Sequence, residues 1–206
     1  MAPAPDDASP EDEPSDNDVP PGYPAFPLTS RRRRLPEEGT LEVFVANEQS
    51  AQPVDVERWG RLAEQVLAAE GIRGDAELSL LFVDEATIAD LNKRFMGTAG
   101  PTDVLSFPLE DDLVGTGRWP DSGTPGPIGN RPEPGDPPLL LGDIVVCPSV
   151  AARNAPTHAG SYDDELALLI VHGILHVLGL DHADTADAAA MQAKERDLLG
   201  RFYQSP

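Results

Sequence analysis

Cysteine, basic residues and long apolar runs are all scarce in this 206-residue sequence. The single cysteine, Cys147, excludes an intrachain disulfide and supplies too few thiolates for the usual structural zinc site. The most apolar window, Leu166 to Leu180, contains two histidines and is shorter than the ~20 residues that span a bilayer. The N-terminus has acids and prolines where a signal peptide needs a basic start and an apolar stretch. We therefore expect a cytoplasmic protein without a membrane segment.

Basic residues are outnumbered, 15 against 36 acids, which gives a net charge of −21 and disfavours unaided binding to a polyanion. Residues 1–38 are rich in proline and hold nine acids and the run Arg31–Arg34, so we predict a disordered tail. The arginine run is interpreted as solvated, with an RNA-binding arm as the alternative. Residues 109–138 are dense in glycine and proline, which predicts a flexible or disordered insert. Tail and insert carry −5 and −4, which leaves −12 on the rest of a single domain over residues 39–206.

The remaining sequence mixes the apolar periods of strands and helices. Strands are expected at residues 41–46, 78–83, 103–108 and 139–147, and helices at 55–69, 84–97, 161–178 and 185–202. Because they interleave without strict alternation, we predict an α+β fold with a small mixed β-sheet of about four strands packed with helices. Trp59 and Phe95 have the spacing of helical core residues, so we predict burial for both rather than a base-stacking role.

The chemistry of the chain concentrates in the segment His172-Gly-Ile-Leu-His176-Val-Leu-Gly179-Leu-Asp181-His182. Histidines at i and i+4 lie on the same face of a helix, where two imidazoles can share one metal ion. Gly179 can adopt positive φ and end the helix, which would bring His182 to the same ion. Three neutral ligands with an open fourth position are typical of a catalytic zinc. The alternative is that two histidines happen to lie on an apolar helix and the third on a loop.

The histidine spacing equals that of the metzincin zinc peptidases, HExxHxxGxxH, which predicts a metzincin-like metal-binding helix. Gly173, however, stands where those peptidases carry their general-base glutamate. A general base commonly contributes ~10²–10⁴ in rate. Its absence argues against peptide hydrolysis, so a degraded peptidase or small-molecule hydrolase is the weaker interpretation.

The segment HGILHVLGLDH resembles the HGxLHLxGYDH signature of the YbeY endoribonucleases, the bacterial rRNA maturation factors. The resemblance extends to GPTDVLSFP at 100–108, to LGDIVVC at 141–147 and to a downstream run containing Met191, Lys194, Glu195 and Leu198. Together these segments cover roughly residues 41–202. Many family members carry an arginine, associated with activity, at the position that is Met96 in this chain.

The resemblance implies a zinc-dependent, single-strand-specific endoribonuclease that matures the 16S rRNA 3′ terminus and acts in ribosome quality control. One Zn²⁺ would be held by His172, His176 and His182, and single-stranded rRNA and the ribosome or its proteins would be partners. Ser106, on the strand beside the metal, and Arg94 are expected to contact the substrate. The rival interpretation is a non-catalytic, zinc-containing ribosome-assembly factor.

Several roles stay open at this level. Either the substrate's own 2′-OH attacks the phosphate, leaving a cyclic phosphate, or water activated on the metal attacks and leaves a 5′-phosphate. Asp181 is either a carboxylate that orients an imidazole or carries a proton, or it caps the final helix or faces water. His158 is expected to be an exposed loop residue. Attraction for RNA comes either from a groove of cations or from zinc and a ribosomal partner, and the candidate cations are Arg58, Arg61, Arg73, Lys93, Arg94 and Arg153.

Overall fold

A four-stranded mixed sheet organises the chain, of which the computed structural model describes residues 40–72, 75–109, 138–180 and 185–205. The strand order is β1-β2-β4-β3, with the first three parallel and β3 antiparallel to β4. β1 and β3 are therefore the two edges. The bounds are β1 (Leu41–Asn47), β2 (Ala76–Phe82), β3 (Val104–Pro108) and β4 (Leu139–Val146). The predicted α+β class with a small mixed sheet is confirmed.

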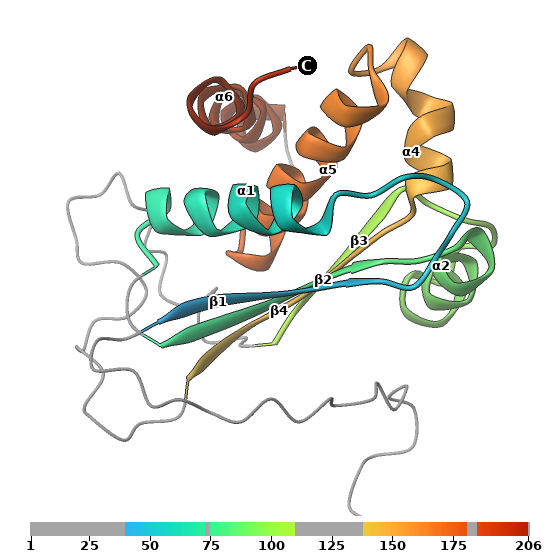
Figure 1. The fold of residues 1–206 in the computed structure, drawn as a ribbon, viewed down its shortest axis with the longest axis horizontal. Helices are drawn as coiled ribbons and strands as arrows, with labels where there is room; N and C mark the ends of the chain where they lie inside the picture. The colour runs from blue at the N-terminus through green and yellow to red at the C-terminus, as the bar shows by residue number, and fades with distance from the viewer. Residues whose placement is uncertain (1–39, 73–74, 110–137, 181–184, 206) are drawn as a thin grey trace, which may run out of the picture. The chain divides into compact units, whose positions relative to one another are not determined.

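The helices cover the two faces of the sheet unequally. α1 and α5 pack against one face and α6 packs on both of them (Figure 1), whereas Ile88 of α2 joins an apolar cluster with Leu81, Leu105 and Val145 on the other face. The helix bounds are α1 (Val56–Ala69), α2 (Glu85–Leu91), the π-helix η1 (Asn92–Met96), α4 (Pro148–Asn154), the 3₁₀-helix η3 (Ala155–Thr157), α5 (Tyr162–Val177) and α6 (Thr185–Phe202). No helix of the described residues is long and apolar enough to cross a membrane.

Some predictions concern residues that the structure does not describe. The tail 1–38 with Arg31–Arg34, all of the insert except Leu109 and Pro138, and Arg73, Asp181 and His182 lie outside the described residues. Elsewhere the predicted elements are all present, with α2 and η1 together forming the helix expected at 84–97. α4 and η3 had no predicted counterpart, because each is too short for an apolar period to emerge.

Phe95 corrects one prediction. Trp59 is buried as expected, at 2% exposure, but Phe95 is 50% exposed. The cause is η1, which continues α2 as a π-helix. Each π turn holds about one residue more than an α turn, so it rotates the residues that follow it away from the face that Ile88 and Leu91 define. The apolar spacing of an ideal α-helix therefore misplaces Phe95.

Helix α5 is buried on almost every side and begins at the predicted cap, where Ser161 Oγ accepts the N–H of Asp164 at 3.1 Å. Its closest approach to the sheet is at Gly173. A Cβ atom there would lie 2.7 Å from Cγ2 of Ile144 on β4 and 3.2 Å from Oγ of Ser106 on β3. Since 2.7 Å is well inside normal contact between carbon atoms, only glycine fits this crossing.

The loop after η3 is fastened to α5 by a buried carboxylate. Glu165 has no exposed surface, both its oxygens lie 3.0 Å from Nδ1 of His158, and one accepts the N–H of Ala159 at 3.2 Å. The hydrogen bond to Glu165 raises the pKa of His158 above its ordinary value. His158 is exposed, as predicted, but its ring also satisfies a carboxylate that could not otherwise be buried.

The tight crossing at Gly173 predicts that Gly173→Ala lowers the free energy of unfolding by about 1–3 kcal/mol, the usual cost of overpacking a core. Gly200→Ala is the matched control, because a Cβ atom added at Gly200 in α6 would meet no neighbouring atom within 4 Å. This control is expected to be neutral or to gain up to ~1 kcal/mol from lost backbone entropy. Urea denaturation measures the free energy of unfolding of both variants. Equal values for Gly173→Ala and Gly200→Ala would show that α5 does not pack tightly against the sheet at Gly173.

The pair His158–Glu165 predicts a stability that depends on pH. Because its folded-state pKa is raised, the protonated ring stabilises the folded chain fully below the unfolded pKa of ~6.5. That contribution is lost as the pH rises through the raised folded-state pKa. The free energy of unfolding of the wild type should therefore exceed that of His158→Gln by at most about 1 kcal/mol at acidic pH, and by less at alkaline pH. Urea denaturation across the pH range checks this, and an advantage that grows with pH would refute it.

Candidate metal centre

His172 and His176 face each other on α5, as their i, i+4 spacing predicted. Their ring centroids are 4.5 Å apart, and the two Nε2 atoms approach to 3.1 Å. Both rings lie on the one stripe of α5 that is not fully buried. The two nitrogens therefore point at a common position on the partly exposed stripe of α5.

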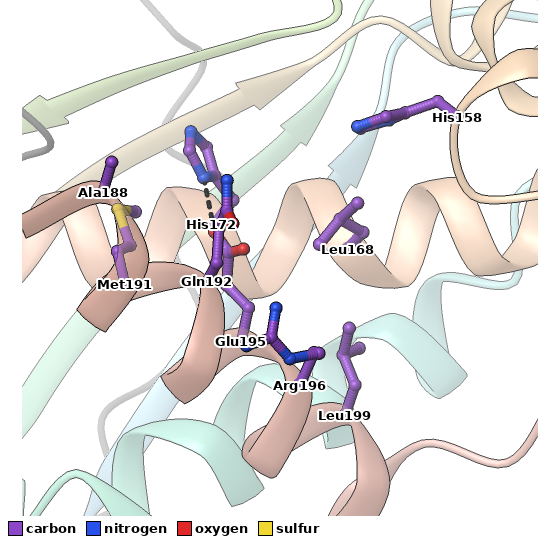
Figure 2. A pocket seen from close by; sticks show the side chains of 9 residues that line it. All are labelled: His158, Leu168, His172, Ala188, Met191, Gln192, Glu195, Arg196 and Leu199. Atoms are coloured by element: carbon purple, nitrogen blue, oxygen red, sulfur yellow. Dashed lines mark hydrogen bonds and ion pairs between the residues drawn. The ribbon is translucent and has the colours of Figure 1, made fainter. Parts of the chain in front are cut away.

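Glu195 of α6 fixes the orientation of the first ring. Its Oε1 lies 2.7 Å from Nδ1 of His172, and the residue is only 8% exposed (Figure 2). An ionised carboxylate only accepts hydrogen bonds, so Nδ1 is assigned the proton. In the neutral imidazole, Nε2 then carries a lone pair toward His176.

The facing nitrogens fit a zinc ion. Two lone pairs 3.1 Å apart repel, so the pair requires a proton or a cation between them. Zinc binds imidazole nitrogens at ~2.0–2.1 Å in tetrahedral geometry, which places two ligand nitrogens roughly 3.3 Å apart. The observed separation is close to that value. Within the described residues, no third histidine, cysteine or carboxylate completes a metal-binding group.

The chain turns sharply after the histidine pair, as predicted for Gly179. Gly179 has φ +87°, its N–H donates to the carbonyl of His176 at 2.9 Å, and the N–H of Leu180 donates to that of Leu175 at 2.9 Å. These two bonds form a Schellman motif, the common end of an α-helix at glycine. The predicted third ligand, His182, follows this turn but lies outside the described residues.

A cavity of about 390 Å³ opens beside His172, between α5 and α6 (Figure 2). The cavity is lined by apolar side chains such as Met191 and Leu199 and by the charged residues Glu195 and Arg196. Glu195 belongs to this wall and was missed as a functional residue by the sequence analysis. It lies four residues after buried Met191, on the inward face of α6, and an acid on an inward face is the signal that identifies it.

Ser106 lies on β3, at the edge of the sheet that is nearest to the histidine pair. Its hydroxyl donates to the carbonyl of Gly173 at 3.3 Å, directly after His172 in the sequence. This bond joins the edge strand to α5. The structure therefore brings Ser106 to the histidine pair, as expected, and gives its hydroxyl a partner within the protein.

Most of the candidate cations, which would form a groove under the first of the two alternatives for RNA attraction, are paired with carboxylates. Arg94 pairs with Asp90 at 2.7 Å, Arg153 with Glu85 at 2.9 Å and Arg61 with Glu57 at 3.6 Å. Lys93 is exposed and makes no ion pair among the residues that the structure describes. These paired arginines do not form one positive channel to the histidines.

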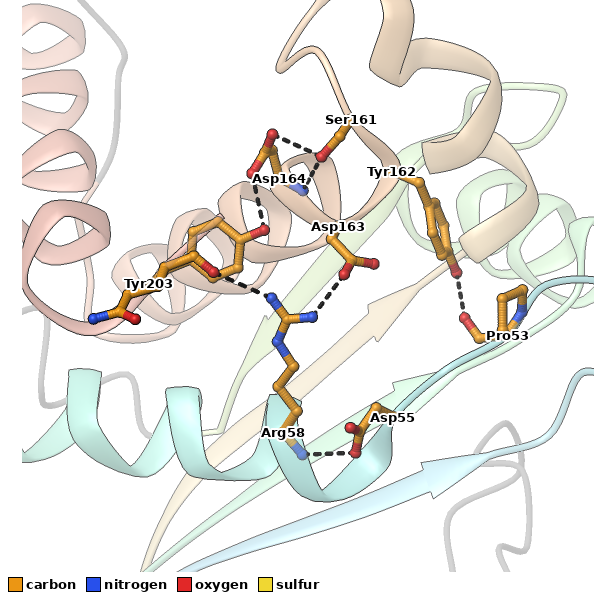
Figure 3. A network of polar contacts seen from close by, with 9 residues as sticks. Pro53, Asp55, Arg58, Ser161, Tyr162, Asp163, Asp164 and Tyr203 are labelled. Atoms are coloured by element: carbon orange, nitrogen blue, oxygen red, sulfur yellow. Dashed lines mark hydrogen bonds and ion pairs between the residues drawn. The ribbon is translucent and has the colours of Figure 1, made fainter. Parts of the chain in front are cut away.

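Arg58 has a structural role instead. Its guanidinium lies 2.6 Å from Asp163 (Figure 3). It also lies 4.7 Å from the ring centre of Trp59 and 5.3 Å from that of Tyr203. The hydroxyl of Tyr203 in turn donates to Asp164 at 2.8 Å. This network ties α1 and the residues after α6 to the start of α5, so Arg58 belongs to the scaffold.

Comparison with known proteins gives consistent matches. The family model described as Endoribonuclease YbeY matches residues 44–203. A protein of Thermobifida fusca with the same description is 45% identical over 165 residues, 80% of this chain and 96% of that protein. Its counterpart in Frankia casuarinae is 43% identical over 79% of this chain and 75% of that protein. The counterpart in Rhodococcus opacus is 44% identical over 80% of this chain and 83% of that protein.

Among solved structures, a solution structure of a Thermotoga maritima protein aligns with a TM-score of 0.45 and 23% identity, covering 77% of this chain and 90% of that one. The family model spans the sheet, the histidine pair and Glu195. With most of its length matched in this way, the chain belongs to the YbeY endoribonuclease family.

Proposed function

We propose that this protein is a zinc-dependent endoribonuclease that cleaves single-stranded RNA, in maturation of the 16S rRNA 3′ terminus and in ribosome quality control. The observation that carries the proposal is the convergence of the two Nε2 atoms of His172 and His176 at 3.1 Å, with His172 held by Glu195. It supports the proposal because it occurs in a chain of a family whose members are described as endoribonucleases.

His172, His176 and His182 would hold one Zn²⁺, with His182 supplied by the chain after the turn at Gly179. Bound there, zinc would act as a Lewis acid on the phosphodiester. Glu195 keeps the proton of His172 on Nδ1, so that Nε2 stays available as a ligand. The rings of His172 and His176 and the carboxylate of Glu195 therefore already have the arrangement that a zinc ion would require.

The crossing at Gly173 also bears on the reaction class. A glutamate at this position, the general base of the metzincin peptidases, would have to displace Ile144 and Ser106. The fold therefore excludes a carboxylate from the peptidase position. RNA tolerates this, because its 2′-OH lies next to the phosphate and is held there by the substrate itself.

Replacing His176 with alanine tests the catalytic proposal. The purified wild type should carry stoichiometric zinc and cleave single-stranded rRNA, and His176→Ala should lose both while it stays folded. Metal analysis, circular dichroism and a cleavage assay measure this. Asp197→Asn is the control, since Asp197 is exposed on α6 and pairs with Arg201 rather than with the histidine pair. If rRNA processing survives in a folded, zinc-free His176→Ala variant, the protein acts by binding alone, as an assembly factor.

Glu195 is a positioning residue, and Glu195→Gln should weaken zinc affinity by about 10- to 100-fold. The physical reason is that an amide accepts the Nδ1 proton more weakly than a carboxylate does. Competition with a chelator measures the affinity, and ¹⁵N spectra of His172 should show a mixed tautomer. Asp197→Asn, an exposed change on the same helix, is the control. Equal zinc affinities in the two variants would contradict the assignment.

A further inference from the structure

The most exposed aromatic surface near the histidine pair is formed by Phe95 and Phe107. Phe95 of η1 is 50% exposed, and its ring meets that of Phe107 edge to face, with centroids 5.0 Å apart and an interplanar angle of 67°. Met96, beside Phe95, is 52% exposed. Phe95 and Met96 are two of the five exposed large hydrophobic residues in the part of the chain that the structure describes.

The aromatic pair is held in place from both sides. Phe107 belongs to β3 and pairs in the sheet with Asp143. η1 is anchored by Asn92, which is 7% exposed and whose side-chain amide donates to the carbonyl of Gly100 at 2.9 Å. Gly97, at φ +68°, ends η1 directly after Met96. Phe95 is therefore presented on a fixed support, and a π-helix turn of this kind frequently marks a functional position.

The pair is also continuous with the candidate metal centre. Phe107 follows Ser106, whose hydroxyl contacts the carbonyl of Gly173 next to His172. Successive side chains of a strand point to opposite faces, so Ser106 faces α5 while Phe107 faces η1. β3 is an edge strand, and the two faces meet at its open side. A chain that crosses this edge can contact the histidine pair on one face and the aromatic pair on the other.

We propose that Phe95, supported by Phe107, is a platform on which one unpaired base of an RNA strand stacks as the strand crosses the edge of β3. Aromatic side chains bind single-stranded nucleic acid in this way because every base has a π face. The charge distribution favours stacking over phosphate contacts, since Arg94, Arg153 and Arg61 are paired with carboxylates. Lys93, in the same helix turn, is exposed and makes no ion pair among the described residues, so it is available to a flanking phosphate.

This inference rests on the proposed function, and the test compares Phe95→Ala with Phe44→Ala. Phe44 is equally exposed, at 50%, but lies on β1 at the opposite edge of the sheet. Phe95→Ala should weaken binding of a single-stranded RNA oligonucleotide by about 5- to 100-fold, the usual loss for one stacked base. KM should rise with kcat and zinc content unchanged. Phe95→Trp should restore affinity, and Phe44→Ala should have no effect.

A second arm locates the base. A series of oligonucleotides is prepared, each with an abasic nucleotide at a different position. Loss of the base at one of these positions should weaken binding to the wild type by the same factor as Phe95→Ala does. Phe95→Ala should be insensitive to that same change, because the stacking partner is already gone. Thermal unfolding of each variant confirms that the fold is kept. Equal RNA affinity in Phe95→Ala and Phe44→Ala, or an abasic effect unchanged by Phe95→Ala, would overturn the inference.

The remaining outcomes separate the two proposals. If Phe95→Ala binds free RNA normally but no longer associates with ribosomal particles, the patch docks a protein and the inference is wrong. If the wild type binds RNA through Phe95 but holds no zinc and cleaves nothing, the inference stands and the proposed function fails. If the wild type cleaves with zinc and Phe95→Ala cleaves with the same KM, only the inference fails.

Discussion

The close approach of α5 to the sheet at Gly173 is the constraint on which the rest of the site depends. It brings the helix within van der Waals contact of β3 and β4, so that the stripe carrying His172 and His176 lies beside the edge strand. The same contact removes any side chain from position 173. One packing requirement thus places the two facing histidines next to the edge strand and also leaves no room at position 173 for the base on which metzincin peptide hydrolysis depends.

Buried acids recur at the points where other elements attach to α5 and α1. Glu165 is hydrogen-bonded to His158 and to the N–H of Ala159, after η3, and Glu195 of α6 is hydrogen-bonded to His172. Glu70, at the end of α1, forms an ion pair with Lys194 at 2.9 Å. Each carboxylate is buried and would be costly without its partner. An acidic protein therefore uses part of its acid excess for specific links between helices. Glu195 differs from the others, because its link also leaves Nε2 of His172 as the nitrogen that faces His176.

The features that could be predicted from the sequence are those formed by residues that lie close together in the chain. The two histidines are one helical turn apart, the caps at Ser161 and Gly179 span three to five residues, and the strands show their own apolar patterns. The contact between His172 and Glu195 joins residues 23 apart and required the packing of α6 on α5 to become visible. Phe95 was misplaced for another reason. A π turn leaves the apolar spacing of the sequence intact while it rotates the side chain into solvent.

The acidic charge of the chain then bears on selectivity as well as on affinity. A nuclease that gripped phosphates with unpaired arginines would attract duplex and single strands alike, since both display the same phosphates. Here Arg94 and Arg153 are paired with carboxylates, and an exposed aromatic ring lies at the edge of β3, on the face of the sheet opposite the histidine pair. In a duplex the faces of the bases are already stacked on each other, so a ring can take only a base that is free. A preference for single strands would therefore follow from weak electrostatic attraction combined with the position of Phe95. It would require no separate element that rejects a duplex.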